Sequence, residues 1–530
     1  MSADAILKRL ESLKSESLSY QNTWRDCAKH VDPLLMAGLN GGTVLDGASN
    51  LSQANGEKFR IYDNTAADAL SDLASAKVSG LVPSSMRWFD MDVQGEPDFR
   101  NAWLDDTADQ MWREIHASNF DAVSPALFYS SDVVGQTAAF IDFDDERQQL
   151  YFEHWHIGGL YFAASRYGDT IDTVYREFQM TAEQLVRRYD GASASTKQVA
   201  KETPGKMIDV CHAIQPRVNG VYGGPAQNKP VQSIVIEKAN RHVVLDTGFD
   251  EMPVVVLRGH KLIPNSQYSV GHVYDALGDI KTLNDAVKML LQSAEMHIGG
   301  MWYGVHDGVM NPATVQIGPR KVVMLADKAN FGRLDAPGNP NFAFAEIEAL
   351  RAQVRRTLKA DRLAVPQQPN MTATEVSVRM ELLRNQMAPM FGRLQADFLT
   401  PLITRCFGLL SRARLLQPPP EELNNAAITI RYVSPLARSQ RVGEVQAMDR
   451  FEAGLAAYAE VKPELMDIYD WDGAQREKSW NLGVPQKFLI SETKVKAMRT
   501  QRAQQQEQAQ AQAQEAEMMT KAAPAMMTKQ

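Results

Sequence analysis

Apolar residues recur every three or four positions through the middle of this chain, and this spacing predicts amphipathic helices. A first helix is predicted over residues 273–298, with one apolar face formed by Leu277, Ile280, Leu283, Val287, Leu290, Ala294 and Ile298. A second is predicted over residues 344–363, with Ile347, Leu350, Val354 and Leu358 on its apolar face. The Gly- and Pro-rich insert between them contains two predicted strands, 314–317 and 322–325.

A third and much longer helix is predicted to follow, ending near Leu416. It begins at a capping box formed by Thr372 and Glu375. Globular helices usually run about 8 to 20 residues, so a helix of about forty residues needs neighbours along its length. Copies of the same chain arranged in a ring would supply them. Because a proline removes a backbone donor and crowds the preceding turn, we expect kinks at Pro389 and Pro401.

The chain before these helices predicts an α+β domain with antiparallel strand pairs. Helices are expected over residues 3–31, 63–81, 99–118 and 124–134, and a capping box begins another at Thr181 with Gln184. Alternating apolar and polar residues predict strands around residues 88–93 and through 138–260. After the long helix we expect a strand at 427–433, helices at 439–461 and 463–470, and a last helix from about Ser491 that fades into a Gln/Ala-rich end. The fold class is α+β and mainly helical.

Composition and charge narrow the function classes. Of 530 residues, 44% are hydrophobic and 23% charged, which is typical of a globular protein. The net charge of −8 argues against a protein that wraps nucleic acid over its whole surface, yet it allows a local basic belt. Three scattered cysteines suggest no disulfide framework and a reducing compartment. We expect no signal peptide and no membrane insertion.

Catalytic motifs are scarce, so we expect no enzyme, no cofactor and no metal site. The sequence has no P-loop, no H-E-x-x-H, no C-x-x-C and no G-x-S-x-G. His154 and His156 share one face of a predicted strand and suit a metal pair, but an amphipathic strand flanking Trp155 is the favoured interpretation. The acidic cluster at Asp142, Asp144, Asp145 and Glu146 suits a divalent cation, but a solvated hairpin turn is the favoured interpretation.

The second central helix carries a cationic stripe at spacings of four, four and three: Arg351, Arg355, Lys359 and Arg362. Two interpretations stay open. The stripe forms salt bridges with acidic residues of the first central helix, namely Asp275, Asp279, Asp285 and Glu295. Alternatively, it faces nucleic acid as a positive belt when repeated around a ring. The uncharged loop that follows contains Gln367, Gln368 and Asn370; it either touches DNA in a channel or simply connects two helices.

Four segments together carry a family resemblance: SYQNTWRDCAKHVDP, NTAADALSDLASAKVSGLVPSSMRWFDM, GHVYDALGDIKTLNDAVKMLLQSAE and LAVPQQPNMTATEVSVRMELL. The chain resembles the head-to-tail connector, or portal, proteins of short-tailed bacteriophages over nearly its whole length. The resemblance implies the portal fold, with its wing, stem, clip and crown, assembled into a ring with a central channel.

Carried onto this chain, the resemblance implies a division into regions. Residues 1–272 correspond to the α+β wing, 273–298 to stem helix 1, 299–341 to the clip and 342–363 to stem helix 2. The tunnel loop falls on 364–372, the long kinked wing helix on 373–416, and a wing strand and linker on 417–438. The crown falls on 439–503 and the Gln/Ala-rich tail or barrel on 504–530.

The resemblance also implies a function and partners. The expected protein is a homo-oligomer, typically a dodecamer, at the portal vertex of the virion, present in the host cytoplasm during assembly. Double-stranded DNA would pass through it during packaging and ejection. Its partners would be the terminase that hydrolyses ATP, the scaffold and major capsid protein, and tail adaptor or gatekeeper proteins. Two alternatives remain: a tail or scaffolding protein without a DNA channel, and a soluble enzyme with an unrecognised site.

Overall fold

A computed structural model describes the following parts of the chain. These are residues 2–36, 39, 55–93, 102–164, 170–263, 266–299, 301–304, 331–334, 340–360, 392–420, 428–432, 435–458, 462, 468–481, 495, 497–502 and 504–505. The chain divides into two compact units, Met1–Leu436 and Ala437–Gln530, and each is described by itself.

The first unit combines helices with antiparallel sheets, as the sequence predicts. Its helices are α1 (Ala3–Val31), η1 (Pro33–Met36), α3 (Thr65–Leu81), α4 (Ala102–Ala117), α5 (Phe120–Val134), α6 (Ala182–Arg188), α7 (Ala194–Glu202), η2 (Ala226–Asn228), α8 (His272–Gly299), α9 (Pro340–Thr357), the π-helix η5 (Gln395–Leu399) and α11 (Thr400–Arg412). Its strands are β1 (Phe89–Val93), β2 (Gln136–Asp144), β3 (Gln149–Trp155), β4 (Leu160–Ala163), β5 (Thr173–Thr181), β6 (Met207–Pro216), β7 (Val231–Glu237), β8 (His242–Phe249), β9 (Val254–Arg258), β10 (Met301–Gly304), β11 (Phe331–Leu334) and β12 (Ile428–Tyr432).

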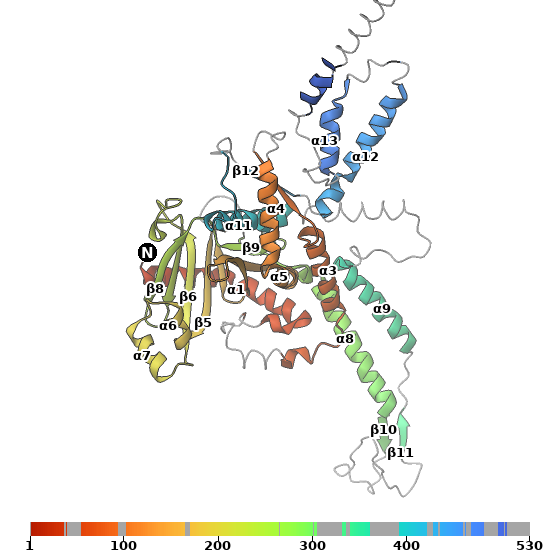
Figure 1. Cartoon of the computed structure of the whole chain (residues 1–530). Helices are drawn as coiled ribbons and strands as arrows, with labels where there is room; N and C mark the ends of the chain where they lie inside the picture. The colour runs from red at the N-terminus through yellow and green to blue at the C-terminus, as the bar shows by residue number, and fades with distance from the viewer. Residues whose placement is uncertain are drawn as a thin grey trace, which may run out of the picture. The chain divides into compact units, whose positions relative to one another are not determined.

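A five-stranded sheet in the order β4-β5-β6-β7-β8 is covered on both faces (Figure 1). Side chains of a strand alternate between faces. Cys211 and Ile234 accordingly pack with Ile6 and Leu10 of α1, whereas Val210 packs in a separate cluster with Leu185 of α6. The helix predicted over residues 3–31 is α1, and Thr181 and Gln184 form the predicted capping box of α6.

A second core joins a three-stranded sheet, β3-β2-β9, to the helices around it. It contains Trp24 of α1, Leu70 of α3, Val133 of α5 and, from the central helices, Ile280 and Val354. The first half of α8 and the last turns of α9 therefore lie in the same hydrophobic core as α1.

Two strands far apart in the sequence, β1 and β12, form an antiparallel pair with Phe89 opposite Tyr432.

Of the long helix predicted over 373–416, residues 392–416 are described, whereas the capping box at Thr372 and the kink at Pro389 lie outside the described residues. The helix is interrupted by the π-helical turn η5, directly before Pro401 in the first turn of α11. A π-bulge is a known cause of kinks, and this one lies in the turn before Pro401, where a kink is predicted. The α-helix ends at Arg412 rather than Leu416, because Arg414 adopts a left-handed φ of 59°.

The second unit contains α13 (Trp471–Asn481) and all of α12 (Pro435–Tyr458) except its first two residues. The Lys478 ammonium lies 2.5 Å from an Asp449 carboxylate oxygen and 2.7 Å from one of Glu452, and so joins the two helices. Helix α13 lies where the sequence analysis expects no helix; most of the helix expected at 463–470 falls outside the described residues.

Candidate nucleic-acid interface

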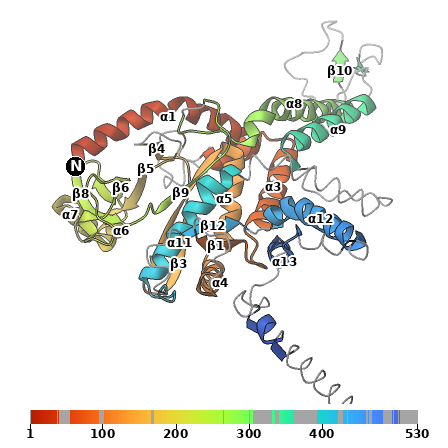
Figure 2. The same ribbon diagram turned by 90° about the horizontal axis from the view of Figure 1, so that it is seen from above.

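The two central helices form an arm that leaves the sheets of the first unit. Figures 1 and 2 show α8 and α9 side by side, with the strand pair β10–β11 at the far end. In that pair Met301 lies opposite Leu334. We call α8, α9 and β10–β11 the arm. Its strands differ from the two predicted in the insert, 314–317 and 322–325, which lie outside the described residues.

The arm has a buried seam and exposed apolar residues. Ile280, Leu283 and Val287 of α8 are buried, as are Ile347 and Val354 of α9, in agreement with the predicted apolar stripes. Other large apolar side chains of the arm face solvent in the single chain: Met289 is 67% exposed, Leu291 52% and Phe344 55%.

Polar contacts fix the arm to the N-terminal part of the chain. The Asn284 side chain accepts a hydrogen bond of 2.7 Å from the Tyr62 backbone N–H and donates one to the Arg60 carbonyl. The Lys281 ammonium lies 2.6 Å from a carboxylate oxygen of Asp26 on α1.

A buried ionic cluster lies where α8 begins. The Asp132 side chain of α5, only 2% exposed, pairs with Lys77 of α3 and with His272, whose Nδ1 lies 3.0 Å from Asp132 Oδ1. Burial alone would raise the pKa of Asp132, but Lys77 and His272 lower it below its ordinary value. The cluster therefore holds three helices together through an ionised carboxylate.

The structure separates the members of the predicted cationic stripe. Arg351 is paired: its guanidinium lies 2.8 Å from Asp63 Oδ2 and 2.6 Å from Glu348 Oε1. Within the described part of the chain, its acidic partners are thus not those of α8. Arg355, one turn further along α9, is exposed. The stripe does not continue as one helical face, because α9 ends at Thr357 and Lys359 has a left-handed φ of 63°.

Lys359 instead lines a cavity of about 340 Å³ at the base of the arm. Basic side chains outnumber acidic ones in its wall, with Lys77, Arg258, Lys359 and Arg393 facing Asp132 and Asp275. The remaining candidates, Arg362, Gln367, Gln368 and Asn370, lie outside the described residues.

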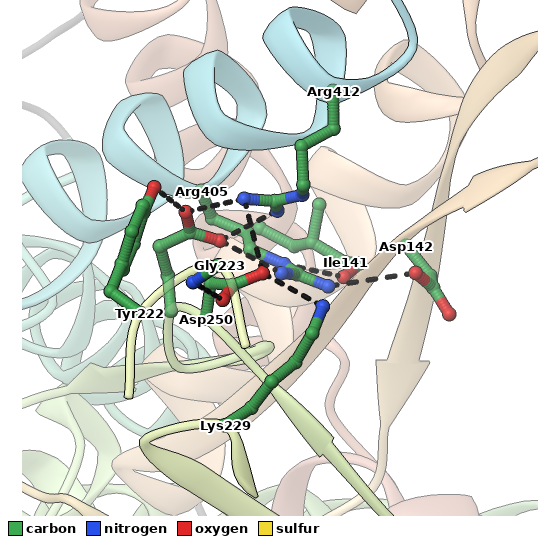
Figure 3. A network of polar contacts seen from close by, with 9 residues as sticks. Ile141, Asp142, Tyr222, Gly223, Lys229, Asp250, Arg405 and Arg412 are labelled. Carbon is green, nitrogen blue, oxygen red and sulfur yellow. Dashed lines mark hydrogen bonds and ion pairs between the residues drawn. The ribbon is translucent and has the colours of Figure 1, made fainter. Parts of the chain in front are cut away.

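An ionic network on α11 was not predicted from the sequence. Figure 3 shows Arg405 reaching toward Ile141 and Asp142, while Arg412 lies nearby. Arg405 Nη1 lies 3.1 Å from Glu251 Oε2, and its Nε donates to the Ile141 carbonyl. Arg412 binds both oxygens of the Glu251 carboxylate at 2.7 Å. Gly408, between the two arginines, leaves room for Glu251, since a Cβ there would come within 2.4 Å of Glu251 Oε1.

The residues of the two candidate metal sites, the histidine pair and the acidic turn, form hydrogen bonds within the fold. His154 Nε2 lies 2.8 Å from Thr137 Oγ1, and His156 Nδ1 accepts a hydrogen bond from the Gly158 backbone N–H. Asp144 Oδ1 accepts hydrogen bonds from the backbone N–H groups of Glu146 and Arg147, which shapes the β2–β3 turn. Among the described residues, no group of three or more His, Cys, Asp or Glu side chains is arranged to hold a metal ion.

Comparison with known proteins decides the family. The sequence pattern of the family described as "Bacteriophage head to tail connecting protein" matches residues 3–490. The chain belongs to this family. Its similarity extends to curated relatives: the "Portal protein" of Salmonella phage epsilon15 is 26% identical over 95% of this chain and 91% of its own length. The "Probable portal protein" of Bordetella phage BPP-1 is 26% identical over 94% of this chain and 91% of its own.

Family membership confirms the resemblance that the sequence segments predict, together with the mainly helical α+β fold. The family's description names a connection between head and tail, which is a structural role. None of the described helices is both long and apolar enough to cross a membrane.

Proposed function

We propose that this protein forms the ring-shaped portal at one capsid vertex of a tailed bacteriophage, with an axial channel for double-stranded DNA. The single observation that carries the proposal is membership of the head-to-tail connecting family across residues 3–490. Two curated relatives of nearly equal length are named as a portal protein and a probable portal protein.

The arm supports assembly into a ring. Met289, Leu291 and Phe344 are exposed in the single chain although they are large and apolar. Large apolar side chains left exposed on an element that extends from the core are candidates for burial against a neighbouring chain. A head-to-tail arrangement around a closed ring gives each arm two neighbours, and the same exposed side chains are covered in every copy. In this proposal α8 and α9 are the stem, and β10–β11 belongs to the clip.

The DNA-facing role is proposed for the exposed side of α9 and the base of the arm. Arg355 has no ion pair with any residue that the structure describes, and Lys359 and Arg393 add positive charge at the cavity. Repeated in every copy, these charges form a positive belt on a protein whose net charge is −8. Such a belt attracts phosphates without reading bases, as a channel for genomic DNA requires. We extend the proposal to Arg362, Gln367, Gln368 and Asn370 as channel-lining residues.

The partners follow from this role. The ring docks a terminase that supplies the ATP hydrolysis, meets scaffold and major capsid protein during assembly in the host cytoplasm, and later binds tail adaptor or gatekeeper proteins in the virion. We propose a dodecamer and no enzymatic activity of its own.

The test is negative-stain electron microscopy of the purified full-length protein, counting subunits in end-on views. We expect closed rings of twelve copies with an axial hole at least as wide as a DNA duplex. Compact monomers or dimers that stay unassembled when co-expressed with the scaffold would contradict the proposal. Rings without an axial hole would favour a tail or scaffolding protein.

A further inference from the structure

A surface pocket of about 670 Å³ lies away from the arm, between the two larger sheets of the first unit. Strands β2 and β3 contribute residues from one sheet, β5 and β6 from the other, and α6 closes one side. Nothing in the connector role described above uses this pocket.

Stacked rings and a guanidinium form its inner part. The Trp155 side chain stacks on Phe140, with ring centroids 5.0 Å apart and an interplanar angle of 7°. The guanidinium carbon of Arg176 lies 4.4 Å from the centroid of the Trp155 ring and 4.8 Å from that of Phe178. Arg176 Nη1 is also 3.0 Å from Glu153 Oε1. Arg176 is therefore held in place before any ligand arrives, and its charge is balanced.

The outer wall carries positive charge that is not balanced. Arg187 and Arg188, in the last turn of α6, are exposed, and neither forms an ion pair with another described residue. Burial, together with the nearby Arg176 and Arg188, lowers the pKa of His212 to about 3, so this histidine adds no charge at neutral pH. The pocket thus has an aromatic inner part, which holds the Arg176–Glu153 pair, and a cationic rim.

A residue of the pocket wall carries an unsatisfied donor. Trp155 is only 2% exposed, and its indole Nε1 is buried without a hydrogen-bond partner among the described residues. Buried indole N–H groups usually find an acceptor. A carboxylate oxygen brought by a ligand would supply one.

We propose that this pocket is a docking site for an acidic segment of a partner protein, in which an aromatic or aliphatic side chain stands beside the carboxylates. The apolar side chain would pack beside Phe178 and Tyr189 in the pocket wall, and the carboxylates would pair with Arg187 and Arg188. A pocket of this volume is large enough to bury one such side chain and its neighbours.

The geometry favours carboxylates over a phosphate group. Phosphate sites commonly use the backbone N–H groups and the positive dipole at the N-terminus of a helix. Here α6 presents its C-terminal turn, whose carbonyls carry partial negative charge. Spaced side-chain carboxylates that reach the arginine tips avoid those carbonyls.

The test uses the full-length protein and a fluorescein-labelled peptide, Glu-Asp-Trp-Glu-Asp, in a fluorescence-anisotropy titration. We expect saturable binding that weakens as salt is added, and little binding of the control peptide Lys-Lys-Trp-Lys-Lys. The R187E/R188E variant should weaken binding about tenfold or more, because two ion pairs become two repulsions. The neutral R187Q/R188Q variant should lie between it and the native protein.

The matched control is K201E/K206E, which makes the same charge change at two exposed lysines outside the pocket. It should bind the acidic peptide within about twofold of the native protein, because distant surface charges are screened. Equal loss in both variants, or none in R187E/R188E, would overturn the proposal. Tighter binding of a single-stranded oligonucleotide at the same arginines would also overturn it. The proposal would also be overturned if the native protein did not bind the peptide and R187E/R188E lost self-association. The pocket would then be a contact between copies of the chain.

Discussion

The guanidinium of Arg351, on α9, lies 2.8 Å from a carboxylate oxygen of Asp63, in the turn that precedes α3. Asp63 is 4% exposed at its side chain and also accepts a hydrogen bond from the Thr65 backbone N–H. One turn away, Arg355 is exposed. The cationic stripe therefore combines an arginine that holds the arm in place with one that is available to a ligand.

The Asp63–Arg351 contact should contribute measurably to stability. Burial alone would raise the pKa of Asp63, but the bonds from Thr65 and Arg351 lower it, so the carboxylate is ionised at neutral pH. We expect Asp63→Asn to reduce the free energy of unfolding by about 1–3 kcal/mol, measured by urea denaturation. Glu348→Gln is the control: Glu348 is 70% exposed, so its loss should cost about 0.5 kcal/mol or less. Equal effects of the two substitutions would show that the buried contact has no special role.

Arg355→Ala should separate DNA handling from folding. Because Arg355 is exposed and has no ion pair among the described residues, the variant should unfold at the same temperature as the native protein and assemble normally. If the exposed side of α9 faces DNA, packaging assays should show less DNA retained per particle, most clearly at low salt, where the lost phosphate contact contributes most. The control is Arg147→Ala, at an exposed arginine of the β2–β3 turn. A packaging defect in both variants, or in neither, would argue against a specific role of Arg355.

Arg405 should be the most sensitive position of the network on α11. Its side chain is 2% exposed and contacts Glu251, Asp142 and the Ile141 carbonyl. Arg405→Ala should lower the free energy of unfolding by about 3–5 kcal/mol, because it opens a cavity and removes a buried ionic partner. Arg412→Ala, at a side chain that is 36% exposed, should cost about 1 kcal/mol. Chemical denaturation distinguishes them, and a smaller loss at Arg405 than at Arg412 would contradict this assignment.

Buried histidines should make the fold less stable in mild acid. Burial, with nearby His154, lowers the pKa of His156 to about 4. In the unfolded chain a histidine titrates near 6.5. Between these values the unfolded state binds more protons, so the free energy of unfolding falls as the pH drops from about 6.5 to 4.

The His156 contribution can be isolated by substitution. His156→Asn should reduce this pH dependence by roughly 1–3 kcal/mol across that window, since one titrating group is removed. The measurement is a series of urea denaturation curves at several pH values, with His242→Asn at an exposed position of β8 as the control. An unchanged slope in His156→Asn would show that another group carries the effect.

Local sequence signals predicted most of the individual elements. The apolar stripe of α8 and the capping box of Thr181 and Gln184 depend on neighbours within a few residues, and both are present in the structure. The ends of α9 were predicted less well. It begins at Pro340 rather than 344, which suits a proline in the first turn of a helix, and it ends before Lys359.

Contacts between residues that lie far apart in the sequence could not be predicted from it. Nothing in residues 89–93 specifies pairing with 428–432, and nothing near Arg351 indicates Asp63 as its partner. One signal for Arg405 was available. It lies three residues after Leu402 and four before Leu409, on the apolar face of α11, and a charged residue in that position has to find buried partners.

The central claim is that the exposed side of α9 faces DNA inside a ring. The most direct measurement is cross-linking from Arg355→Cys, labelled with a thiol-reactive photo-cross-linker, in DNA-filled particles. The native Cys27, Cys211 and Cys406 are buried, and burial raises the pKa of each thiol to about 12, so the introduced thiol should react selectively. We predict a DNA adduct from position 355 and none from Arg147→Cys. Absence of an adduct at 355 in filled particles would contradict the account.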